Sequence, residues 1–159
     1  MTPARRYLRP VLLGGFIAGT IDVGAACLIN GLSPPRILQA IASGVLGKPA
    51  FSSGLPAAAL GLVLQWAMSI LIAIIFVAAA QRLVILKRRW FASGLAYGVV
   101  IYFVMNFVVV PLSAAPFTPK IKLPRSIEDL LAMLLFGLII TYFARQVATG
   151  GAVSPPPKA

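Results

Sequence analysis

One acidic residue lies well inside an apolar segment of the chain, and its chemistry needs explaining first. Asp22 stands in the apolar run from Val11 to Ile29. A carboxyl group near the centre of a membrane helix costs about 2.5 to 3.5 kcal/mol, so such groups are usually kept for a reason. At about 1.5 Å per residue, Asp22, Gln65 and Asn106 lie roughly 9 to 15 Å below the outer ends of their apolar runs. We therefore expect these three residues to form an intramembrane polar cluster.

Two roles for this cluster remain open. In the first, a protonated or hydrogen-bonded Asp22 fastens its helix to Gln65 and Asn106. In the second, Asp22 is a proton or cation site in a water-accessible cleft. No second membrane-embedded charge is available at that depth as a partner, and this favours the structural role.

Other kinds of chemistry lack the residues they require. Histidine is absent and Cys27 is the single cysteine, so the sequence predicts no metal site and no cofactor. No nucleophile and base stand at catalytic spacing, and we expect no enzyme activity. The acids Glu128 and Asp129 follow Ser126 in a pattern typical of a helix start, so we interpret them as capping residues.

The elements that carry these residues are membrane helices. The chain has 159 residues, of which 60% are hydrophobic and 11% charged, and its mean hydropathy is +0.96. A water-soluble domain of this size could not bury so many apolar side chains in one core. The predicted fold is therefore an all-α membrane protein, a bundle of four transmembrane helices in a single domain over residues 1–148. The four spans cover about residues 11–30, 55–80, 90–112 and 127–146.

Small residues are expected to hold these helices together. Helices in lipid associate through close packing at small residues and through hydrogen bonds. Gly15 and Gly19 form a Gly-x-x-x-Gly pair in the first span, and Gly94 and Gly98 form another in the third. We predict that these four glycines are helix-packing positions.

The connections between the spans differ from one another. Residues 34–46 have a helix start at Ser33 and apolar residues on one face, which predicts a short amphipathic helix in the outer interface. A partly re-entrant segment is the alternative, because the polar face of Arg36, Gln39 and Ser43 is narrow. Residues 111–124 contain four prolines and are expected to form an extended loop. Residues 149–159 are expected to be a disordered tail.

Basic residues indicate the orientation. The sequence has fourteen Lys and Arg against three acids. Nine of the basic residues fall in the two termini and the second connection, and five in the other two connections. The positive-inside rule then places both termini in the cytoplasm. The basic cytoplasmic loops should contact anionic lipid headgroups rather than nucleic acid.

Three blocks of the sequence resemble a known family. They are Gly15-Phe-Ile-Ala-Gly-Thr-Ile-Asp22, Leu38-Gln-Ala-Ile-Ala-Ser-Gly-Val-Leu-Gly47 and Met105-Asn-Phe-Val-Val-Val-Pro-Leu-Ser113. They look like the uncharacterised bacterial inner-membrane proteins related to YagU, and the similarity spans most of residues 14 to 143. The resemblance implies a small four-span inner-membrane protein. Members often carry a histidine where this chain has Gln65, and another near the start of the fourth span, so no metal or proton-relay role transfers to this chain.

The function expected from these observations is non-enzymatic. We expect an inner-membrane protein that acts as a homo-oligomer or as an accessory subunit of a larger membrane complex, because the two glycine pairs offer more packing surface than a simple bundle needs. The alternative is a small proton, cation or solute transporter or channel with a polar core around Asp22.

Overall fold

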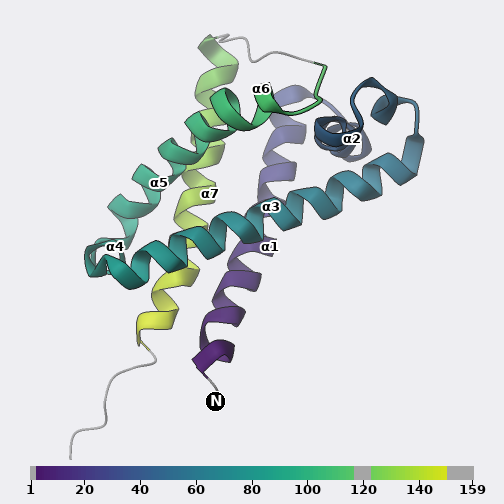
Figure 1. Ribbon diagram of the computed structural model, residues 1–159. Coiled ribbons are helices and arrows are strands. Elements are labelled where there is room, and N and C mark those ends of the chain that lie inside the picture. The colour runs from purple at the N-terminus through teal and green to yellow at the C-terminus, as the bar shows by residue number, and fades with distance from the viewer. Residues whose placement is uncertain (1–2, 117–122, 150–159) are drawn as a thin grey trace, which may run out of the picture.

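The computed structural model describes residues 3–116 and 123–149 of the chain, and within these ranges it contains helices and no strand (Figure 1). The elements in chain order are α1 (Pro3–Asn30), α2 (Pro34–Leu46), the 3-10 turn η1 (Lys48–Phe51), α3 (Gly54–Arg82), α4 (Val84–Arg88), α5 (Trp90–Val104), the π-helical turn η2 (Met105–Val109), α6 (Val110–Leu112) and α7 (Leu123–Thr149).

Four of these helical segments are long and apolar enough to cross a membrane. They are Tyr7–Asn30, Gly54–Arg82, Trp90–Leu112 and Ser126–Arg145. The expectation of an all-helical chain with four such segments is thereby confirmed. Many of their apolar side chains are exposed and few are fully buried, as expected of helices in lipid, since lipid tails are as apolar as leucine. The chain is a multi-pass membrane protein.

Three of the long helices, α1, α7 and α5, lie side by side, and the fourth, α3, crosses α1 (Figure 1). In Figure 1, α7 lies between α1 and α5, and it packs along both. Helix α3 runs obliquely across α1, and the half of α3 nearer its N-terminus extends towards α2. Where the helices meet, an apolar core forms from Val11 and Ala18 of α1, Ala73, Phe76, Val77 and Ala80 of α3, Ile101 of α5, and Phe136, Ile140 and Ala144 of α7.

Glycines set the distance between α5 and α7. A Cβ atom on Gly98 would lie 2.5 Å from the carbonyl oxygen of Met133 and 2.7 Å from the Cα of Leu134. One on Gly94 would lie 2.6 Å from the Thr141 hydroxyl, and one on Gly137 would overlap the backbone of Gly94. The two backbones touch, so any larger residue at these positions would separate the helices.

The crossing of α1 and α3 is equally close. A Cβ atom on Gly15 would lie 2.9 Å from the Cα of Ile70, and one on Gly19 would lie 2.5 Å from the hydroxyl of Ser69. The glycine pairs of the first and third spans therefore both pack inside this chain. Neither pair is left over for contact with a second copy.

Helix α2 turns a different face to the protein than the sequence suggested. Gln39 and Ser43, expected on a polar face towards water, are 8% and 0% exposed, whereas Val45 is 62% exposed. The backbone at Leu38 lies directly on Gly61 of α3, and the amide of Gln39 donates a 3.0 Å hydrogen bond to the carbonyl of Gly54. Gln39 is buried because it finds a hydrogen-bond partner on α3, and the Ser43 hydroxyl is satisfied within α2 by the carbonyl of Ala40, while the apolar Val45 faces outward.

The third span ends in an irregular turn. The π-helical turn η2 precedes Pro111, which lies within α6 rather than in an extended loop. Proline has no backbone N–H, and a local π-turn is one way to rearrange the hydrogen bonds that it breaks. After α6, the amide of Ala114 donates to the carbonyl of Gly44 at 2.9 Å and ties this end to α2. Residues 117–122, part of the expected loop, lie outside the described residues.

The helix of the fourth span begins before the span itself, which agrees with the expected bounds. Helix α7 starts at Leu123, so Ser126 lies within the helix and does not cap it. Pro124 is tolerated there because the first N–H groups of a helix have no partner in the helix. Residues 150–159, which include nearly all of the expected tail, lie outside the described residues.

Candidate functional site

The polar site of the membrane region is built on the crossing of α1 and α3. The side-chain amide of Gln65 donates a 2.8 Å hydrogen bond to Oδ2 of Asp22. The same nitrogen lies 3.3 Å from the carbonyl oxygen of Gly19, one turn earlier in α1. Because glycine lets the helices approach closely, the amide of Gln65 reaches both acceptors. One α3 side chain thus binds two oxygens of α1.

Further hydrogen bonds surround this contact. The indole N–H of Trp66 donates to the hydroxyl of Thr20 at 3.3 Å, and the Trp66 ring packs edge-on against Phe16 at 5.1 Å. The hydroxyl of Ser69 donates to the carbonyl of Gln65 within α3. The side chains of Gln65 and Trp66 therefore both donate hydrogen bonds to α1 at or just beyond Gly19.

The third predicted member lies elsewhere. The amide of Asn106 donates to the carbonyl of Tyr102, one turn back in its own helix, at 3.0 Å. Asn106 belongs to η2, which directly continues α5 into α6. The structure thus brings Asp22 and Gln65 together and leaves Asn106 out of the pair. Asn106 and Asp22 were expected at similar depth, but α7 lies between α1 and α5 and keeps the two side chains apart (Figure 1).

A second acid approaches from α7. The carboxyl of Asp129 is close enough to Asp22 for the two to interact electrostatically. The antiparallel packing explains this: Gly14 packs on Phe143, which sets Asp129 roughly 9 Å above Asp22 along the helices. Sequence reasoning treated Asp129 as a helix start and missed this neighbour, because the pairing of α1 with α7 is not visible in the sequence.

Another polar tie joins α3 to α5. The hydroxyl of Tyr97 donates to the backbone carbonyl of Ile72 at 2.8 Å, and the Tyr97 ring packs on Phe76 at 4.9 Å. The sequence analysis did not select Tyr97. Its position in the middle of an apolar span was the available signal, since a hydroxyl in hydrocarbon needs an acceptor.

The site is a polar contact that joins two membrane helices. Among the residues the structure describes, no three His, Cys, Asp or Glu side chains gather as metal ligands, and Cys27 is a half-buried free thiol. The buried side-chain nitrogen and oxygen atoms of that part of the chain all have hydrogen-bond partners. What the arrangement can do is hold α1 and α3 in register, with one partly buried carboxyl group between them.

The function of the chain has to be inferred from this geometry, because comparison with known proteins gives no match. No family model, no curated protein and no solved structure matches the chain.

Proposed function

We propose that this chain is a non-enzymatic protein of the bacterial inner membrane, with both termini in the cytoplasm, that works as a subunit of a membrane assembly. The partner is either further copies of the chain or another membrane protein. On sequence resemblance we place it beside the YagU-like proteins. The observation that carries the proposal is the hydrogen bond from Gln65 to Asp22.

That bond supports a structural role for the membrane-embedded acid. An acid that served chemistry would be expected in a cleft beside a second reactive group. Here the Asp22 carboxyl accepts a hydrogen bond from Gln65, which also contacts Gly19. A polar pair that joins two membrane helices is typical of structural glue within a bundle.

The surface for a partner differs from the one that the sequence suggested. The glycine pairs are used inside the chain, so they cannot also serve an assembly. Helix α3 instead carries an uncovered stripe of small and branched residues at spacings of three and four, which places them on one face. We call this set the α3 stripe: Ala59, Val63, Ala67, Leu71, Ile74 and Ala78.

The test is the state of the protein extracted from its native membrane. Native mass spectrometry in a mild detergent is expected to show a multimer of the chain or a stable complex with another protein. In a Cys27→Ala background, an Ala67→Cys variant should form crosslinks through the stripe. A Phe91→Cys variant, also exposed but on α5, is the matched control and should not crosslink. A monomer without partners would refute the proposal.

A second candidate function is supported by a separate observation. Asp22 is partly rather than fully buried and interacts electrostatically with Asp129, and both features are compatible with a proton or cation site of a small transporter. Measurement of proton or monovalent-cation flux into liposomes that contain the protein distinguishes a transporter from an assembly subunit. A transporter loses flux on Asp22→Asn substitution while the fold is kept, whereas unchanged flux rejects this candidate.

A further inference from the structure

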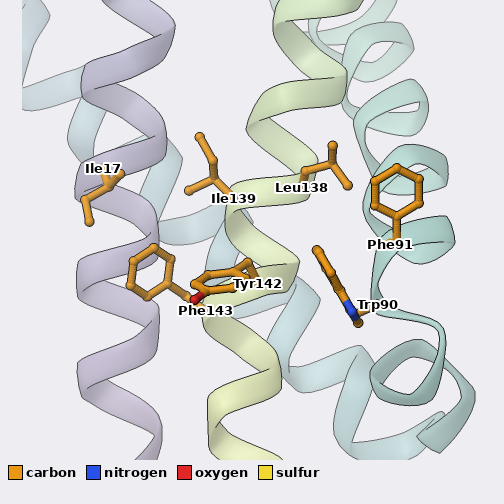
Figure 2. Close-up of a pocket in the computed structure, with 7 residues that line it drawn as sticks. All are labelled: Ile17, Trp90, Phe91, Leu138, Ile139, Tyr142 and Phe143. Carbon is orange, nitrogen blue, oxygen red and sulfur yellow. The ribbon is translucent and has the colours of Figure 1, made fainter.

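An apolar groove opens on the surface where α7 passes between α1 and α5. Its volume is about 250 Å³. Figure 2 shows its lining, with Ile17 from α1, Trp90 and Phe91 from α5, and Leu138, Tyr142 and Phe143 from α7. The groove lies away from the Asp22 and Gln65 pair, at the end of the molecule where α5 begins.

Two lining residues of this groove, Trp90 and Tyr142, hold the guanidinium group of Arg145. The guanidinium carbon of Arg145 lies 4.6 Å from the centre of the Trp90 ring and 4.4 Å from the centre of the Tyr142 ring. Contact with two aromatic rings holds a guanidinium by cation–π attraction and leaves its N–H groups able to donate to an anion.

Among the residues that the structure describes, no acidic side chain is in reach of Arg145. Glu128 and Asp129 lie at the other end of α7, at least roughly 24 Å away along the helix. Asp22 lies eight residues, roughly 12 Å, beyond Gly14, which packs on Phe143 near Arg145. The positive charge at the groove is therefore not neutralised by a carboxylate of these residues.

We propose that this groove binds one anionic phospholipid of the adjacent leaflet, with an acyl chain on the apolar lining and the phosphate on Arg145. The exposed residue Arg89, which directly precedes Trp90, adds positive charge nearby. Tryptophan and tyrosine beside a basic residue are typical of the headgroup level of a membrane.

The size of the groove favours an acyl chain over a helix of another protein. Small-molecule sites usually measure roughly 300 to 1,000 Å³, and this groove, at about 250 Å³, is slightly smaller. A helix with its side chains is about 10 Å wide, and a groove of this volume could take only a few of its side chains.

Trp90 itself can report on the occupant. In a Trp66→Phe background, Trp90 is the single tryptophan, and brominated acyl chains quench its fluorescence on contact. The full-length protein is reconstituted in phosphatidylcholine vesicles that contain phosphatidylglycerol at a low fraction, with bromine on either one lipid or the other. We expect phosphatidylglycerol to be enriched around Trp90 by roughly fivefold, the factor expected for attraction to one basic residue.

Four variants separate a binding site from general surface charge. Arg145→Gln should abolish the enrichment and Arg145→Lys should retain part of it. Arg88→Gln removes the same charge from an exposed residue that does not line the groove, and it should leave the enrichment intact. Ile17→Phe fills the groove and should reduce quenching by either lipid.

Three results would overturn the proposal. One is equal quenching by both lipids. Another is a failure of the charge dependence, in which the enrichment survives Arg145→Gln or is lost in Arg88→Gln as much as in Arg145→Gln. The third is the absence of quenching by either lipid, which would mean that protein covers the groove. Circular dichroism of each variant, compared with the parent, verifies that the fold is retained.

Discussion

The side-chain amide of Gln65 donates a 2.8 Å hydrogen bond to Asp22 across the crossing of α1 and α3. The two residues are 43 positions apart in the chain. Their contact depends on the glycines of α1, which allow the helix axes to approach closely at this depth.

Removing the donor should weaken the crossing. We expect Gln65→Leu to lower the free energy of unfolding by about 0.6 to 1.7 kcal/mol, the range for hydrogen bonds between membrane helices, because Asp22 then loses its donor. Asp22→Asn should have little effect, since an amide oxygen still accepts from Gln65. Unfolding in mixed micelles by titration with a denaturing detergent measures both. A Gln65→Leu variant as stable as the parent would contradict the structural role.

Substitution of Gly98 should separate α5 from α7. A Cβ atom there would lie 2.5 Å from a backbone oxygen of α7, which cannot move like a flexible side chain. We expect Gly98→Ala to cost about 1 to 3 kcal/mol, as overpacking does in cores. Gly24→Ala is the matched control, because a Cβ atom at Gly24 meets no atom within 4 Å. Equal losses in the two variants would rule out the close-packing argument.

Helix α2 should come loose when Gly61 is replaced. A Cβ atom on Gly61 would overlap the backbone of Leu38. In a Cys27→Ala, Ser43→Cys background, we expect Gly61→Ala to speed thiol labelling at the buried position 43 by roughly tenfold, which corresponds to about 1.4 kcal/mol. Gly44→Ala is the control, because its added Cβ atom would lie 3.7 Å from Ser113, at an ordinary contact distance. Labelling at position 43 should remain slow in that variant. Slow labelling in the Gly61→Ala variant would show that α2 does not depend on this contact.

The orientation prediction can be tested with reporters. We expect green fluorescent protein fused after Ala159 to fluoresce, and alkaline phosphatase at the same position to be inactive, because the termini and the second connection carry most of the basic residues. Fusion after Ser53, between the first two spans, should give the opposite pattern. An active phosphatase at the C-terminus would invert the topology and place the Arg145 groove in the other leaflet.

The sequence by itself determined the number and approximate position of the long helices. Apolar runs of about 20 residues with few charges have few alternatives to membrane helices, since each backbone N–H and C=O must be paired within the segment. The expected contact of Asp22 with Gln65 also occurs in the structure, because a carboxyl and an amide at similar depth on adjacent helices satisfy each other.

Only the tertiary structure decided which helices are neighbours. The lipid-facing and protein-facing sides of α3 and α5 are both apolar, so no periodic pattern reveals that α7 lies between α1 and α5. That order separates Asn106 from Asp22, brings Asp129 towards Asp22 and places Arg145 against Trp90. It also uses both glycine pairs within the chain and turns the polar side of α2 inward. These outcomes depend on close packing and hydrogen bonding between surfaces that hydropathy does not distinguish.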